Sequence, residues 1–243
     1  MLRRHELSRP RLLRLLNELD ATPVSSGITL ALPPGTPLPD GIAFAPNGDE
    51  LRNFIMRSPR GAFVFAGPSR FVAVSPPFPV GAPYRAEGYR TEPLRQNAQQ
   101  HYRLGAVLVR YGGYAIGVVE DGRLVAARND SRFVKNRHRK GGQSQRRFER
   151  IREKQIHELF AHCCEDATAL LESWRGRLDW LAYGGDAHTV QAFLKACAPL
   201  RDFPARVLPR FFSVPEPRHE TLERLPELIA STTVLEWRAE AGL

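Results

Sequence analysis

Apolar and polar positions follow two periods along this chain, one typical of helices and one typical of strands. In the first hundred residues, apolar positions at helical spacing predict a helix over 9–19 and a shorter one near 50–57. Short apolar runs bounded by glycines and prolines predict strands over 27–32, 62–66 and 71–74. This mixture of elements predicts a small α+β unit in the first part of the chain.

A proline-rich stretch follows the last of these strands. It contains Pro76, Pro77, Pro79 and Pro83. Proline fixes φ and removes a backbone donor, so the stretch is typical of an extended linker. We therefore expect a boundary between about 80 and 100, with an N-terminal α+β domain over 1–95 and a second domain over 96–243.

Beyond this stretch, strands and helices alternate. A strand over 104–110 is apolar nearly throughout, as a strand buried on both faces would be. Asp121-Gly122 lies between two β-type runs, 114–120 and 123–127, which is a strong hairpin pattern. Further strands are expected over 180–183, 205–212 and 232–237, and further helices over 187–197 and 219–230. The alternation predicts a mixed sheet layered with helices, in the α/β or α+β class.

A long helical pattern opens at about residue 144 and continues to Trp174. Its core-facing positions fall at helical spacing and consist of Phe148, Ile151, Gln155, Ile156, Leu159, Phe160, Cys163, Ala167, Leu170, Leu171 and Trp174. Basic residues within the first three turns occupy other faces. We therefore expect one helix that packs on the domain and also presents positive charge, with Phe148 in the core rather than stacked on a base.

Two short features after this helix have structural explanations. Gly184-Gly185 indicates a turn from strand to helix that needs φ > 0, because no glycine-rich nucleotide-binding fingerprint surrounds it. Asp186 is the expected N-cap of the helix that follows.

Composition and cysteine spacing limit the class of protein. A chain of 243 residues, 42% hydrophobic and 25% charged, can form two modest cores. No stretch approaches the ~20 apolar residues of a membrane span, and no signal peptide opens the chain, so we expect a cytoplasmic protein without membrane contact. Cys163, Cys164 and Cys197 lack a metal-binding spacing, and adjacent helical positions diverge. We expect buried thiols, with no metal, no cofactor and no disulfide.

The candidate chemistry is concentrated in Gly141-Gly142-Gln143, directly before the long helix. Two glycines let the backbone adopt φ > 0 and approach a ligand closely, while a glutamine amide offers both a donor and an acceptor. Such a triplet arises by chance in about one chain in twenty at average glycine usage. The residues on either side of the triplet therefore decide whether it is functional.

Those neighbours are strongly basic. Between residues 131 and 154 there are ten Lys and Arg side chains and two acids, so this segment carries nearly all of the +9 net charge. Such density neutralises phosphates and favours RNA as a partner. The candidate RNA contacts are Lys135, Arg137, His138, Arg139, Lys140, Arg146, Arg147, Arg150 and Lys154. The alternative is a solvated basic helix face, which the adjoining glycines and glutamine make the weaker interpretation.

The family resemblance of the chain rests on two adjoining motifs, Arg139-Lys140-Gly141-Gly142-Gln143-Ser144 and Arg147-Phe148-Glu149-Arg150-Ile151-Arg152-Glu153. They resemble the catalytic loop and following helix of the eukaryotic and archaeal class-I translation release factors. A looser resemblance extends over about 102–237, which has the order of elements of that catalytic domain. Within this group the chain is most similar to the Vms-like release factor family, which frees nascent chains from stalled, split ribosomes.

The resemblance implies a ribonuclease-H-like fold for the second domain and a peptidyl-tRNA hydrolase activity. Gln143 would position the attacking water and stabilise the transition state, while Gly141 and Gly142 would permit the backbone shape. The implied partners are the large ribosomal subunit, its ribosomal RNA and peptidyl-tRNA, without a cofactor, and we expect a monomer. Residues 1–95 lack the Asn-Ile-Lys-Ser type of motif that reads stop codons, and the sequence ends soon after 102–237, which leaves no room for the third domain that recruits a GTPase partner in those factors. The resemblance therefore favours ribosome rescue and ribosome-associated quality control over translation termination at a stop codon.

Two other classes of function fit the same residues. A nuclease could use the basic loop to cut the tRNA near its acceptor end, and the tRNA product would then lose its terminal CCA. A non-catalytic ribosome-binding or RNA-binding module would need only the positive charge, and substitution of Gln143 would have no effect. An acyl-enzyme is disfavoured, because Ser144 lies outside a nucleophile elbow and the seven histidines are scattered.

Overall fold

The computed structural model describes residues 2–23, 26–42, 49–131 and 143–239, with the backbone alone for 143–146. The chain divides into two compact units. The first unit combines Met1–Gln100 with Glu227–Leu243, and the second is His101–Pro226.

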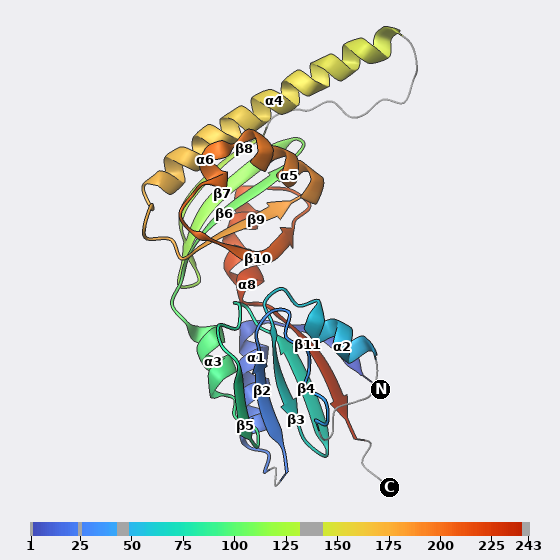
Figure 1. Ribbon diagram of the computed structural model, residues 1–243. Coiled ribbons are helices and arrows are strands. Elements are labelled where there is room, and N and C mark those ends of the chain that lie inside the picture. The colour runs from blue at the N-terminus through green and yellow to red at the C-terminus, as the bar shows by residue number, and fades with distance from the viewer. Residues whose placement is uncertain (1, 24–25, 43–48, 132–142, 240–243) are drawn as a thin grey trace. The chain divides into compact units, whose positions relative to one another are not determined.

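The first unit is built on a six-stranded sheet in the order β1-β11-β4-β3-β2-β5, and every neighbouring pair is antiparallel (Figure 1). Its strands are β1 (Arg3–Leu7), β2 (Ile28–Leu32), β3 (Ala62–Ala66), β4 (Arg70–Ser75), β5 (Tyr84–Glu87) and β11 (Thr232–Arg238). The helices described with it are α1 (Arg9–Asp20), α2 (Asp49–Met56) and α3 (Glu92–Gln99). The expected mixture of helices and strands is confirmed.

Alternate residues of this sheet face two helical layers. Phe65 of β3 packs in one buried cluster with Leu16 of α1 and Leu94 of α3. Its neighbour Val64 packs in a second cluster with Ile55 of α2. Because side chains alternate along a strand, α1 and α3 cover one face of the sheet and α2 covers the other.

The last strand of the chain belongs to this first sheet. We expected residues 232–237 in a second domain over 96–243, but β11 pairs with β1 and β4. Two further strands, β1 and β5, have no counterpart among the predicted strands, and β5 lies where we expected the boundary. The apolar and polar pattern of a short strand shows which of its faces is buried, but it does not show which strands lie beside it. Here the neighbouring strands are distant in the sequence.

The second unit is built on a five-stranded mixed sheet in the order β10-β9-β6-β7-β8 (Figure 1). Its strands are β6 (Arg103–Arg110), β7 (Gly113–Glu120), β8 (Arg123–Ser131), β9 (Trp180–Gly185) and β10 (Arg206–Ser213). Strands β6, β7 and β8 are antiparallel neighbours, whereas β9 runs parallel to both β6 and β10. The helices described with it are α4 (Gln143–Glu172), α5 (Ala187–Ala196), α6 (Ala198–Arg201) and α7 (His219–Glu223). The division between the units falls inside α8 (Leu225–Ala230), and the expected mixed sheet is confirmed.

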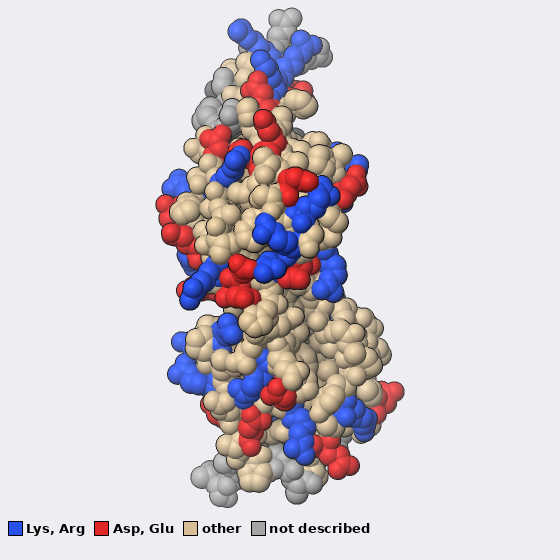
Figure 2. Space-filling model, turned by 90° about the vertical axis from the view of Figure 1, so that its left-hand side faces the viewer, with Lys and Arg blue, Asp and Glu red and all other residues tan. Residues whose placement is uncertain are grey.

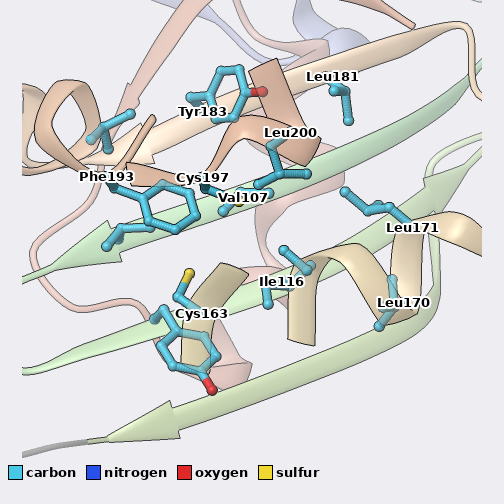
Figure 3. Packing of buried hydrophobic residues seen from close by; sticks show 14 of the residues in the cluster. Val107, Ile116, Cys163, Leu170, Leu171, Leu181, Tyr183, Phe193, Cys197 and Leu200 are labelled. Atoms are coloured by element: carbon cyan, nitrogen blue, oxygen red, sulfur yellow. The ribbon is translucent and has the colours of Figure 1, made fainter. Parts of the chain in front are cut away.

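One hydrophobic core joins helices to this sheet (Figure 3). Ile116 of β7, Cys163 of α4 and Phe193 of α5 pack in the same buried cluster. Gly117 faces the other way, and a Cβ atom built there would lie 3.2 Å from the side chain of Leu222 in α7. Helices α4 and α5 therefore cover one face of the sheet, and α7 approaches the opposite face.

The backbone confirms two predicted turns. Asp121 and Gly122 join β7 to β8 with φ values of 48° and 83°, the positive values of a type I′ hairpin. Gly185 ends β9 with φ 116°, and a Cβ atom there would collide with a carbonyl oxygen of β6. Asp186 is the N-cap of α5 and accepts a hydrogen bond from the Thr189 amide at 2.8 Å. Hydrogen bonds from the Thr189 hydroxyl and amide hold the pKa of Asp186 below its usual value.

A disulfide joins Cys164 of α4 to Cys197 at the end of α5, with Cα atoms 5.5 Å apart. The expectation of unpaired thiols is therefore wrong for these two residues, and Cys163 alone is a free, buried thiol. Neighbouring positions on one helix diverge, so Cys163 and Cys164 do not pair with each other. The bond instead forms between two helices that pack on the same face of the sheet.

Reduction of this disulfide is expected to lower the free energy of unfolding by about 2–4 kcal/mol, because the reduced chain gains entropy when it unfolds. The two cysteines are 33 residues apart in the sequence, so the bond closes a long loop. Urea unfolding with and without a thiol reductant measures the difference. Cys197→Ser should match the reduced wild type, while Cys163→Ser keeps the bond and should remain sensitive to reductant. Equal stability of the oxidised and reduced wild type would contradict this prediction.

Candidate functional site

Helix α4 has a packed half and an exposed half. From Leu159 onward, its inward-facing residues are buried in the core of the second unit. Residues 147–150 are all exposed. Because four consecutive residues point to every side of a helix, no side of α4 is packed against the core at this position. Figure 1 shows this first half of α4 extending past the edge of the second sheet. The start of a 30-residue helix is therefore open to a partner.

The expected catalytic loop lies largely outside the described residues. Gly141 and Gly142 are outside them. So are five of the expected RNA contacts: Lys135, Arg137, His138, Arg139 and Lys140. The backbone of Gln143 forms the first residue of α4, but its side chain and that of Arg146 are not described. The structure thus places Gln143 at the N-terminal end of a long helix, where free backbone N–H groups and the helix dipole favour negative charge.

Three of the expected RNA contacts are described on the exposed half of α4. Arg147, Arg150 and Lys154 are spaced by three and four residues, which places them on neighbouring turns of one helix face. Lys154 is 79% exposed, and its Nζ atom lies 3.7 Å from Oε1 of Glu158. An ion pair this exposed stabilises the helix little, so Lys154 can exchange its partner for a phosphate. Figure 2 shows Lys and Arg side chains gathered over the start of α4.

Phe148 is exposed, contrary to the expectation that it packs in the core. Its accessible fraction is 43%, and it stands between Arg147 and Arg150. The predicted helical period is right, but at this position α4 has extended beyond the sheet, so the apolar stripe has left the core (Figure 1). An exposed ring among arginines suits stacking on an RNA base.

Tyr111 and Arg152 form a contact that the sequence analysis did not anticipate. Tyr111 lies in the turn between β6 and β7 and is 44% exposed. The guanidinium carbon of Arg152 lies 4.8 Å from the centre of its ring, where a cation and an aromatic face attract each other. This contact ties α4 to the sheet near the point where the helix leaves it. A tyrosine in a glycine-rich turn is too common a pattern to indicate such a pairing.

A buried tyrosine fixes the position of α4 further along. Tyr114 of β7 is 1% exposed, and its hydroxyl donates to Oδ2 of Asp166 in α4 at 2.7 Å. Arg128 of β8 donates to the other oxygen of that carboxylate at 3.0 Å. Burial, followed by the hydrogen bond to Asp166, raises the pKa of Tyr114 far above its usual value, so the hydroxyl stays protonated. One carboxylate therefore joins α4 to two strands.

Tyr114→Phe is expected to lower the free energy of unfolding by about 1–3 kcal/mol, because it removes a hydrogen bond to a charged acceptor and keeps the ring. Urea unfolding under oxidising conditions measures the loss. Tyr183→Phe is the matched control, since Tyr183 is buried in the same core but its hydroxyl makes no hydrogen bond to the residues that the structure describes. An equal loss in both variants would show that the bond to Asp166 contributes nothing specific.

In the described part of the chain, the His, Cys, Asp and Glu side chains form no group of three or more that could hold a metal ion. None of the helices described there is both long and apolar enough to cross a membrane.

A family model matches nearly all of the second unit and continues into β11 of the first. Residues 102–235 fit the family described as acVLRF1, the Actinobacteria/chloroflexi VLRF1 release factor. This range is more than half of the chain and begins beside His101, the first residue of the second unit.

Two curated relatives are archaeal proteins named peptide chain release factor subunit 1. The protein from Aeropyrum pernix is 28% identical over 199 residues, which is 68% of this chain and 53% of that protein. The protein from Pyrococcus abyssi is 32% identical over 132 residues, which is 52% of this chain and 31% of that protein. The chain therefore spans about half or less of the length of these relatives.

Two solved structures resemble the chain more weakly. The archaeal translation termination factor aRF1 superposes with a TM-score of 0.36 at 22% identity, over 86% of this chain and 66% of that one. Pelota from Archaeoglobus fulgidus superposes with a TM-score of 0.31 at 11% identity, over 93% of this chain and 63% of that one. At these TM-scores neither structure bears on the site.

Proposed function

Because this chain belongs to the Actinobacteria/chloroflexi VLRF1 release factor family, we propose that it is a peptidyl-tRNA hydrolase that frees nascent chains from stalled large ribosomal subunits. Its partners are the large subunit, the ribosomal RNA there and peptidyl-tRNA. It acts in the cytoplasm as a monomer and uses no cofactor. The observation that carries the proposal is the exposed, basic first half of α4, which begins at Gln143.

The geometry of α4 suits delivery of a short motif into a confined RNA site. A helix rises about 1.5 Å per residue, so the backbone of Gln143 lies about 24 Å along the axis from Leu159, the first buried residue among the described side chains of α4. The hydrogen bond from Tyr114 to Asp166 holds the packed half of α4 against the sheet, and the contact of Arg152 with Tyr111 holds the helix near the point where it leaves the sheet. A rigid arm carries its tip to a defined position at a lower entropic cost than a loop of the same length.

The reaction is hydrolysis of an ester. Water attacks the carbonyl carbon that joins the peptide to the 3′ end of the tRNA, and a tetrahedral intermediate forms. The bond to the tRNA oxygen then breaks, and a proton passes to that oxygen. The amide of Gln143 orients the water, and its backbone N–H donates to the developing oxyanion. Gly141 and Gly142 let the backbone approach the ester, and ribosomal RNA supplies the remaining environment.

We assign the binding of ribosomal RNA to the basic residues near the N-terminal end of α4. Arg147, Arg150 and Lys154 would contact phosphates along one side of α4, together with the basic residues of the preceding loop. Phe148, exposed between two arginines, would stack on a base and add a contact that salt does not weaken.

We also propose that this release proceeds without decoding of a stop codon. This is supported by residues 1–95, which carry no motif of the Asn-Ile-Lys-Ser type. The proposed place of this protein is therefore ribosome rescue and ribosome-associated quality control, where a nascent chain remains attached to tRNA without a stop codon to read.

Single-turnover release of labelled peptide tests the proposal, with peptidyl-tRNA held on isolated large ribosomal subunits. Wild-type protein is expected to free the peptide and leave a tRNA that keeps its terminal CCA. A tRNA shortened at its acceptor end would instead identify a nuclease. Binding without release above background would identify a docking module.

A further inference from the structure

A cavity of about 510 Å³ in the first unit is lined by arginine and serine side chains. It lies beside α2, between the turn that follows this helix and strands β1, β4 and β11. Three arginines are among its lining residues, Arg4 of β1 and Arg57 and Arg60 of the turn. Among the described residues that line the cavity, Glu50 is the one acid. The lining therefore carries an excess of positive charge.

A hydrogen-bonded chain fixes one of these guanidinium groups. Arg60 is 6% exposed, and its Nη2 atom donates to the hydroxyl of Ser75 at 3.1 Å. The hydroxyls of Ser75 and Ser58 lie 2.9 Å apart, and Ser58 donates its proton to the carbonyl of Gly61. Ser75 must therefore donate to Ser58 and accept from Arg60. This arrangement sets the orientation of the Arg60 fork before any ligand arrives.

The backbone of the same turn is equally constrained. The Gly61 amide donates to the carbonyl of Ser58 at 3.1 Å, and the carbonyl of Arg60 accepts from the Val80 amide at 2.9 Å. Gly61 has φ 75°, and a Cβ atom there would collide with the carbonyl of Leu32. A substituted residue at this position would be strained, so the turn that presents Arg60 is specified by the sequence.

The other two arginines are exposed at the rim. Arg4 and Arg57 are both accessible to solvent, and the guanidinium carbon of Arg4 lies 5.9 Å from the ring centre of Phe54. A planar fork of N–H donors matches the oxygens of a phosphate, and a prearranged fork loses less entropy on binding. The cavity therefore combines one buried arginine, whose orientation is fixed by hydrogen bonds, with two exposed arginines at its rim.

We propose that this cavity binds a phosphate group of the RNA backbone and gives the first unit its own contact with ribosomal RNA. The choice of RNA over a small phosphate rests on the proposed function, which brings the chain to the large subunit. The volume exceeds that of a single phosphate and admits a phosphate with its flanking sugar. The contact is separate from the basic half of α4 and does not take part in the chemistry.

The double variant Arg4→Ala/Arg57→Ala tests this contact and leaves the buried Arg60 in place. Its Kd for isolated large ribosomal subunits is expected to rise about tenfold, and the salt dependence of binding should become shallower by about two phosphate contacts. Arg9→Ala/Arg11→Ala is the matched control, because both residues are exposed on α1, across the sheet from the cavity. Thermal unfolding of both double variants checks that each still folds.

A second arm uses inorganic phosphate as the probe. Phosphate is expected to raise the Tm of the wild type and of the control Arg9→Ala/Arg11→Ala. It should raise the Tm of the cavity variant, Arg4→Ala/Arg57→Ala, by less. A change in phosphate binding without a change in subunit binding would overturn the RNA contact and leave a small-anion site. Unchanged subunit binding and unchanged phosphate response would overturn the cavity as a site altogether.

Peptide release separates this inference from the proposed function. The cavity variant should reach the wild-type release rate at saturating protein and differ only in the concentration that saturates. If wild-type protein binds large subunits but releases no peptide, the proposed function fails, while the binding comparison still decides the cavity.

Discussion

Gln143→Ala is expected to slow peptide release by about 10²–10³-fold, because it removes the amide that orients water and helps to stabilise the oxyanion. The expected change is in the rate constant at saturating protein. Affinity for the large subunit should remain within a factor of about two, since the binding energy comes from charged side chains along α4 and the loop. Single-turnover release on isolated large subunits, followed over a range of protein concentrations, separates the two quantities.

Gln145→Ala is the matched control for this effect. Gln145 has the same side chain two residues further along the chain, in the same turn of α4. A loss confined to Gln143→Ala would show that the position of the amide matters and not the general polarity of the segment. Equal losses in both variants would indicate damage to the start of the helix. Full activity in Gln143→Ala would exclude this residue from the chemistry.

Local patterns in the sequence predicted the elements that depend on neighbouring residues. Asp121-Gly122 indicated a hairpin because type I′ geometry requires φ > 0 at both positions, and both have it. Gly185 indicated a strand-to-helix turn because glycine adopts positive φ readily, and Asp186 indicated a helix cap because its side chain can accept a hydrogen bond from the first turn. The alternation of strands and helices predicted the mixed sheet of the second unit.

Features that join distant parts of the chain were missed. Strand β11 pairs with β1, so strands from opposite ends of the chain lie side by side, and neither pattern specifies the other. The Cys164–Cys197 bond and the contact between Tyr111 and Arg152 likewise depend on how α4 packs. Each is decided by tertiary contacts that no local window contains.

The sequence predicted which residue types form the candidate site, and the structure shows that α4 carries them beyond the edge of the sheet (Figure 1). Helical periodicity placed Phe148 on the core-facing side of α4, which is the right side of the helix. It could not show where the sheet ends along that helix. The exposed position of Phe148 follows from the length of α4 beyond the sheet, and this same length gives the basic residues access to a partner (Figure 1).

The double variant Arg147→Glu/Arg150→Glu is expected to weaken binding to large ribosomal subunits by about 100-fold, because two phosphate contacts become repulsive. Both side chains project from exposed turns of α4, so the core of the second unit should be unaffected. The release rate at saturating protein should stay close to that of the wild type. Equilibrium binding measured at several salt concentrations gives both the affinity and the salt dependence, which should be shallower than in the wild type.

Arg201→Glu/Arg218→Glu removes the same charge from elsewhere on the second unit. These arginines are 60% and 68% exposed, and each lies beside an acid, so their reversal should cost little stability. If net charge alone attracts the subunit, both double variants will lose the same affinity. A loss confined to Arg147→Glu/Arg150→Glu would instead assign binding to the face of α4 that leads to Gln143. The two outcomes differ because long-range attraction depends on total charge, whereas a phosphate contact depends on where each charge stands.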